Sequence, residues 1–255
     1  MRKLWVPVLV MLASIPAASA GEYDLARERF VSVYESRVRE ASGLGLRISL
    51  DTTYRDYFGG VKLEDGRLTI VLGSELELKP KMTPDVYTLI LCHEVGHLLG
   101  GEPRKRRGVP GFLPSMEGQA DYYAAASCLR EMFSRYPLPA GPAAETDAET
   151  DAETDADAAA VPCDAAWAEE SDRRVCRRTV LAGKAMFDYV LTMYDGFPDR
   201  PEAPEIGRPE APGVSAGYEY PSFQCRLDTF VAGATGAPRP GCWWPAPAPA
   251  PVPVR

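Results

Sequence analysis

The only two histidines of the chain, His93 and His97, lie four residues apart, and Glu94 directly follows the first. Residues four apart share one face of an α-helix, with β-carbons roughly 6 Å apart, so both imidazoles can bind one metal ion. Glu94 is rotated by about a hundred degrees around the helix from His93. It can therefore face the open side of the metal without being a ligand. This H-E-x-x-H pattern is typical of two zinc ligands and a general base.

An isolated H-E-x-x-H pattern also arises by chance, so the helix that carries it has to be considered. Residues 84–99 are apolar nearly all round, and such a helix belongs in the centre of a domain. An unpartnered His93 or Glu94 there would cost several kcal/mol in lost hydration. A metal ion would offset that cost, which favours a metal site over an ordinary buried helix.

A catalytic zinc needs a third protein ligand, and without a third histidine this ligand must be a carboxylate or a thiolate. Pro103 excludes the extended three-histidine form of the motif. Glu117 is the best candidate, and Asp121 shares its helix face four residues later. We expect Glu117 to bind the metal and Asp121 to accept the free ring N–H of one histidine. The alternative is that both are solvated residues at a helix N-terminus.

The two motifs read His93-Glu94-Val95-Gly96-His97 and Glu117-Gly118-Gln119-Ala120-Asp121. Together they resemble the gluzincin metallopeptidases, most closely the HtpX-like pattern, in which the second motif reads E-x-x-A-D. The resemblance covers about residues 67–135. It implies a zincin-like core, in which a small β-sheet packs on the first motif's helix and a second helix carries the second motif. It also implies hydrolysis of peptide bonds, although many such enzymes have membrane helices that this sequence does not predict.

Under this interpretation Zn²⁺ is held by His93, His97 and Glu117, and Glu94 acts as the general base of a zinc metalloendopeptidase. The partner is then a peptide or protein substrate. A non-catalytic binding or scaffold protein that is stabilised by zinc is the alternative function. A disulfide-stabilised interaction module without metal is a third.

A second hydrogen-bond donor normally stabilises the oxyanion that forms during hydrolysis. The candidates are Tyr123, Tyr218 and Tyr220, although each could equally be a packed or surface tyrosine. The strand expected before the motif helix, at 67–73, could offer an open edge to an extended peptide, or it is a core strand. The basic run at 104–107 lies between the two motifs, which places it near the mouth of the cleft.

Alternating helix and strand patterns predict an α+β fold that is mostly helical. Thr83 and Pro84 predict a capped helix start, and Asp65-Gly66 predicts a hairpin turn. The expected elements are helix 22–42, strand 46–51, hairpin 61–73, helices 84–99 and 115–136, a long helical segment at 164–195, and a short helix within 217–234.

The sequence also indicates how the chain divides into segments. Arg2 and Lys3, an apolar run and Ala18-Ser19-Ala20 predict a cleavable signal peptide and export to the periplasm or beyond. No later stretch is long enough to span a membrane. The predicted segments are signal peptide 1–20, metallopeptidase core 21–136, disordered acidic and Pro-rich insertion 137–162, helical part 163–242 of the same domain, and Pro-rich tail 243–255.

Six cysteines in an exported chain indicate disulfides, although six permit fifteen pairings. The local pairs Cys163–Cys176 and Cys225–Cys242 are preferred, and Cys92 could be a buried free thiol instead. The net charge of −8 gives little indication of function, because seven carboxylates lie in the run at 145–157. Nothing in the charge pattern supports nucleic-acid binding.

Overall fold

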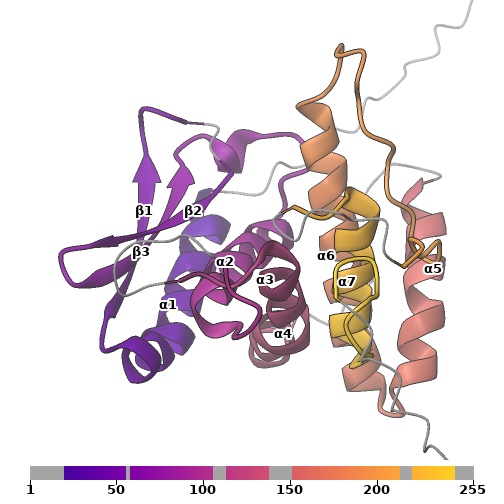
Figure 1. Cartoon of the computed structure of the whole chain (residues 1–255), viewed down its shortest axis with the longest axis horizontal. Coiled ribbons are helices and arrows are strands. Elements are labelled where there is room, and N and C mark those ends of the chain that lie inside the picture. Colours follow the sequence, from indigo (N-terminus) through magenta and orange to yellow (C-terminus); the bar gives the residue numbers. More distant parts are fainter. Residues whose placement is uncertain (1–19, 56–57, 106–112, 138–150, 213–219, 245–255) are drawn as a thin grey trace, which may run out of the picture.

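The computed structural model of the protein describes residues 20–55, 58–105, 113–137, 151–212 and 220–244. It confirms an α+β fold that is mostly helical (Figure 1). The helices are α1 (Ala20–Ser42), α2 (Pro84–Leu99), α3 (Glu117–Tyr123), α4 (Arg130–Arg135), α5 (Asp151–Ala166), α6 (Glu170–Thr192) and α7 (Phe223–Thr235). The strands are β1 (Gly45–Asp51), β2 (Gly60–Glu64) and β3 (Arg67–Gly73).

The three strands form one sheet in the order β1-β3-β2, with β1 parallel and β2 antiparallel to β3. The hairpin predicted between β2 and β3 is confirmed, and both turn residues, Asp65 and Gly66, have positive φ angles. β3 is the central strand, so the core-strand alternative for residues 67–73 is confirmed and the open-edge alternative is wrong. The outer strands of the described sheet are β1 and β2.

α2 lies in the centre of the molecule, where it contacts the sheet, α1, α3 and α6 (Figure 1). Its start is the predicted one: the Thr83 hydroxyl accepts from the Val86 amide at 3.2 Å, and Pro84 occupies the first helical position. The chain leaves the helix at Gly100, and Gly101 follows with a φ of 81°. Every residue from Val86 to Leu98 is buried, as the apolar composition predicts.

The helix predicted at 115–136 is continuous from Glu117 to Arg135, but its middle is wider than an α-helix. Residues Ala124–Leu129 form a π-helical segment between α3 and α4. A segment of this kind changes the direction of the side chains that follow it. Cys128 lies in this segment and is bonded to Cys92 of α2, which settles the choice that the sequence left open for Cys92.

The prediction of disorder at 137–162 is wrong for residues 151–162, which belong to α5. The acidic composition suggested a solvated segment, but Ala159 and Cys163 share one helix face and are fully buried. The basic residues of α6 balance the acidic ones, as in the ion pair between Lys184 and Asp155. A short turn then separates α5 from α6, so the predicted helix at 164–195 is two helices. Residues 138–150 lie outside the described part.

Three disulfides join the described cysteines. Cys163–Cys176 and Cys225–Cys242 are the preferred local pairs, and both are confirmed. Three disulfides indicate an oxidising compartment. No helix within the described residues combines the length and apolar character that crossing a membrane requires. The predicted signal peptide lies outside the described residues except for Ala20, the first residue of α1.

The predicted tail at 243–255 begins too early. Trp243 is buried, and its indole N–H donates to the Thr229 hydroxyl at 2.8 Å. Trp243 and Trp244 are therefore part of the fold, next to the disulfide between Cys225 and Cys242. The rest of the predicted tail lies outside the described residues.

Candidate metal centre

α2 and α3 bring three metal-binding side chains together. The ligand atoms of His93, His97 and Glu117 all lie within 4.8 Å of one another. Nε2 of His93 is 3.2 Å from one oxygen of Glu117, and Nε2 of His97 is 3.6 Å from the other. The three residues are only 6%, 8% and 3% exposed. Two imidazole nitrogens and one carboxylate oxygen suit a divalent metal ion with a remaining open position.

Gly96, inside the first motif, explains how the two helices come so close. A β-carbon at this position would lie 2.8 Å from the Ala120 carbonyl oxygen of α3. A larger residue would therefore separate α2 from α3 and move Glu117 away from the histidines. The glycine between the two motif histidines therefore permits the close approach that brings Glu117 to both of them.

The far nitrogen of each histidine is held by an acceptor. Nδ1 of His93 donates to the Asp121 carboxylate at 2.7 Å, and Nδ1 of His97 donates to the Ser115 carbonyl oxygen at 2.8 Å. With Nδ1 bound in this way, the Nε2 atom of each histidine points toward Glu117. Acceptors of this kind fix the tautomer and make the imidazole a stronger ligand. Asp121 has the predicted contact, whereas nothing in the motif pattern pointed to Ser115.

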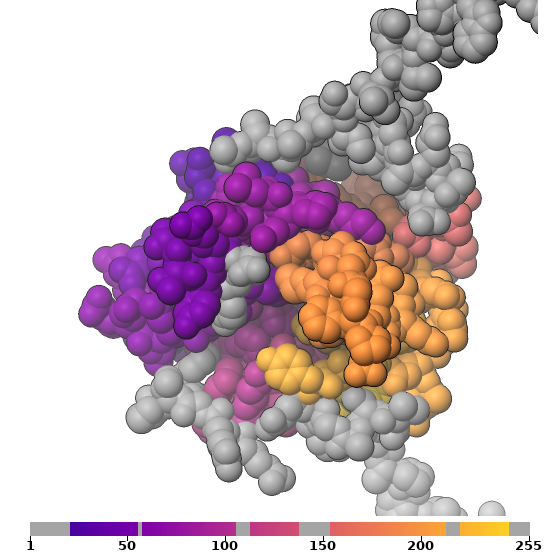
Figure 2. Space-filling view, turned by 90° about the horizontal axis from the view of Figure 1, so that it is seen from above, coloured from indigo at the N-terminus to yellow at the C-terminus, as the bar shows by residue number. Residues whose placement is uncertain are grey.

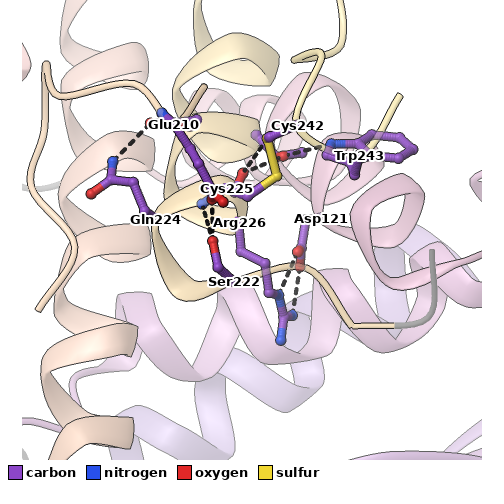
Figure 3. The surroundings of a disulfide bond; sticks show 10 residues. Asp121, Glu210, Ser222, Gln224, Cys225, Arg226, Cys242 and Trp243 are labelled. Carbon is purple, nitrogen blue, oxygen red and sulfur yellow. Dashed lines mark hydrogen bonds and ion pairs between the residues drawn. A yellow bond between two sulfur atoms is a disulfide. The ribbon is translucent and has the colours of Figure 1, made fainter. Parts of the chain in front are cut away.

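Arg226 of α7 is a charged residue of the site that lies outside both sequence motifs. Its guanidinium donates to both oxygens of Asp121, at 2.7 and 2.8 Å, and lies 3.9 Å from Glu117 (Figure 3). A signal was present in the sequence: Phe223 and Phe230 place Arg226 on the apolar face of its helix. An arginine on such a face requires a buried acidic partner.

The charges around the histidines change several pKa values. Burial alone would raise the pKa of Asp121 and of Glu117, but Arg226 and His93 hold both below their ordinary values. Burial and the neighbouring His93 lower the pKa of His97 to about 4, so this ring is neutral at pH 7. Burial opposes the charged form of His93, but Asp121 and Glu117 raise its pKa to about 10. A neutral imidazole is the form that binds metal, so His97 is already in that form and His93 has to release a proton.

Glu94 lies beside this group on α2 and is 4% exposed. A β-carbon on Gly59, just before β2, would lie 2.8 Å from its carboxylate oxygen, so the backbone there lies directly against Glu94. Burial raises the pKa of Glu94 to about 7. A carboxyl group with such a pKa can both accept and release a proton near neutral pH.

The basic loop after α2 reaches the centre through Lys105, whose ammonium donates to Glu117 at 2.7 Å. Arg106 and Arg107 lie outside the described residues. The sequence predicted that this loop lies near the mouth of the site, and the contact between Lys105 and Glu117 agrees with that position. The sequence did not single out Lys105 from its basic neighbours.

Two of the three tyrosines proposed as oxyanion donors, Tyr123 and Tyr220, are described, and they lie in different places. Tyr220 is 71% exposed, and its ring centroid lies 5.5 Å from the Lys105 ammonium, which donates to Glu117. Glu117 and then burial raise the pKa of Tyr220. Burial raises the pKa of Tyr123, whose neighbouring groups include Tyr34 and Arg37 of α1. That position does not suit the predicted role. Tyr218 lies outside the described residues.

Figure 2 shows a hollow on one face of the molecule, between the sheet side in purple and the end of α6 and the segment after it in orange. Residues of the C-terminal part, in yellow, lie at its edge. The segments that border the metal centre include Gly59 just before β2, the loop after α2 and the residues before α7.

The described residues contain one other close group of possible ligands, Glu210 with Cys225 and Cys242. The two sulfur atoms are joined in a disulfide, so they are not thiolates and cannot bind metal. Comparisons with protein-family models, with curated proteins and with solved structures find no match. The function therefore has to be inferred from the geometry of the centre.

Proposed function

We propose that the protein is an exported zinc metallopeptidase of the gluzincin type. The observation that carries the proposal is the convergence of His93, His97 and Glu117, with Glu94 buried next to His93 on α2. A structural zinc site has four protein ligands as a rule, whereas a catalytic site has three and keeps an open position. Among the described residues, this group contains three ligands. The presence of a carboxylate that is not a ligand supports the catalytic alternative.

Bound zinc would polarise a water molecule and the substrate carbonyl group. Glu94 accepts the proton of the attacking water and transfers it to the leaving amine. Asp121 and Ser115 orient the two histidines, and Arg226 keeps Asp121 ionised and in place. Tyr220 is the remaining described candidate for the donor that stabilises the oxyanion.

The proposal is tested by zinc content and peptide cleavage in the wild type and in Glu94→Gln. Glu94→Gln keeps the size of the side chain but removes the base. We expect it to bind zinc like the wild type and to lose cleavage of casein and of a peptide library by a factor of at least about 100. The matched control is Glu102→Gln, an exposed glutamate after α2 whose loss should leave both properties unchanged.

A zinc-stabilised binding or scaffold protein of the cell envelope is the second candidate. The low exposure of all three ligands favours it, because structural metals are usually enclosed by protein. A wild type that holds zinc but cleaves no peptide of a broad library would support this function and contradict the first. A purified protein that retains no metal would contradict both.

A further inference from the structure

Lys105 has a fixed backbone position at the mouth of the metal centre. Its amide N–H donates to the Pro114 carbonyl oxygen at 2.7 Å, and Arg104 forms an antiparallel bridge with Ser115. Ser115 is the residue whose carbonyl oxygen accepts from His97. The backbone that carries the Lys105 side chain is therefore tied to a metal ligand, unlike that of an ordinary surface lysine.

The ammonium group of Lys105 lies between two groups of the site. It donates to Glu117 at 2.7 Å, and it lies 5.5 Å from the ring centroid of Tyr220. Its side chain is 23% exposed, so the charge is partly removed from water but still accessible. Glu117 is also a proposed metal ligand, so a bound metal ion would share its negative charge with Lys105. The positive charge of Lys105 would then be only partly neutralised.

A count of charges around the ligands indicates what the site attracts. The nearby carboxylates are Glu94, Glu117 and Asp121, and the cations are Lys105 and Arg226. Both oxygens of Asp121 are bound by Arg226, so Arg226 is already matched. A divalent ion gives this group one more positive charge than negative. Lys105 is the cation of the two that borders the mouth, where a substrate enters.

We propose that Lys105 binds a carboxylate of the substrate beside the metal, and that it selects peptides with a carboxylate close to the bond to be cleaved. This inference rests on the proposed peptidase function. The carboxylate can be the C-terminus of the peptide or the side chain of an aspartate or glutamate. An ammonium–carboxylate contact that is partly shielded from water changes affinity by about tenfold.

The test measures peptide binding by calorimetry to zinc-loaded Glu94→Gln, which removes the proposed base. Four versions of one peptide are compared: a free C-terminal acid, its amide, and the amide with either glutamate or glutamine next to the cleavage site. We expect one or both carboxylate-bearing peptides to bind about tenfold more tightly than their neutral partners. The acid and glutamate pairs separate the two sources of the carboxylate.

The same comparison is made after Lys105→Met, Lys105→Arg and, as a control, Lys81→Met, which removes an exposed lysine away from the ligands. Lys105→Met should abolish the preference while zinc content stays unchanged, Lys105→Arg should retain most of it, and Lys81→Met should retain all. The KM values of the wild type for the same peptides should show the same ranking. Equal affinity for acid and neutral peptides, in a protein that does cleave peptides, would overturn the role of Lys105 alone. Failure of the wild type to cleave any peptide would overturn the peptidase function and this inference with it.

Discussion

Asp121 has two partners on different helices. It accepts from the His93 ring and is bound through both oxygens by Arg226 of α7. The carboxylate is fully buried, so neither contact is exchanged easily for water. Through these two contacts, a residue more than a hundred positions after the motif fixes the orientation of the His93 ring in the candidate metal centre.

Arg226→Met removes the cation and leaves Asp121 buried beside a metal ligand. We expect zinc affinity to fall by about 10–100-fold, because the acceptor that orients His93 loses its support. We also expect the free energy of unfolding to fall by about 3–5 kcal/mol. Competition with a zinc-binding dye and urea unfolding measure the two effects. Arg174→Met, at an exposed position of α6, is the control. Unchanged zinc affinity in Arg226→Met would show that Arg226 is only a stabilising residue.

At the scale of single residues, the local motifs predict the part of the site that lies on α2 and at the start of α3. Helical spacing pairs His93 with His97 and Glu117 with Asp121, because it sets which side chains share a face. The resemblance to the two-motif pattern is what placed the two pairs together. Arg226 and Lys105 could not be placed in this way. Their positions depend on how α7 and the loop after α2 pack against α3, and spacing within one segment contains no information about that packing.

Two disulfides of similar sequence separation connect different elements. Cys163–Cys176 joins α5 to α6, and Cys225–Cys242 joins α7 to the segment that carries Trp243 (Figure 3). A β-carbon at Gly118, next to Glu117, would lie 2.5 Å from the Trp243 ring. Trp243 therefore packs directly on the helix that carries the third metal ligand.

This arrangement predicts different effects for two paired substitutions to serine. Removal of either disulfide should lower the free energy of unfolding by about 3 kcal/mol, since the closed loops are of similar length. Cys225→Ser with Cys242→Ser should also weaken zinc binding, because Trp243 and Arg226 lose their support. Cys163→Ser with Cys176→Ser should not. Zinc titration at 25 °C separates them, and equal zinc affinity in both double variants would contradict this coupling.

Elements were predictable where a local signal exists, such as the Thr83 cap or the turn at Asp65. The acidic helix α5 was not, because composition alone describes a solvated segment. Its order depends on partners elsewhere in the chain, including the Cys163–Cys176 bond and the basic residues of α6. The π-helical segment at Ala124–Leu129 likewise has no pattern in the sequence that distinguishes it from an α-helix.

In the whole molecule, the metal centre lies where the sheet side and the helical C-terminal part meet. α2 packs with α1 and the sheet (Figure 1). Asp121 of α3 links His93 of α2 to Arg226 of α7. A metal ion held between α2 and α3 would bind the folded protein and not the unfolded chain, in which the ligands are far apart. Metal binding should therefore stabilise the entire fold rather than one loop.

Removal of the metal should lower the thermal unfolding midpoint. A ligand present at about a hundred times its Kd contributes roughly 2.7 kcal/mol, which corresponds to a decrease of about 5–10 °C for a domain of this size on chelation. Differential scanning calorimetry with zinc and with EDTA measures the shift. Glu117→Gln, which removes the third ligand, should show a much smaller difference between the two conditions. The midpoint of Glu94→Gln should respond to EDTA like that of the wild type, because Glu94 is not a ligand. A wild type whose midpoint is the same with zinc and with EDTA would contradict a metal ion held between α2 and α3.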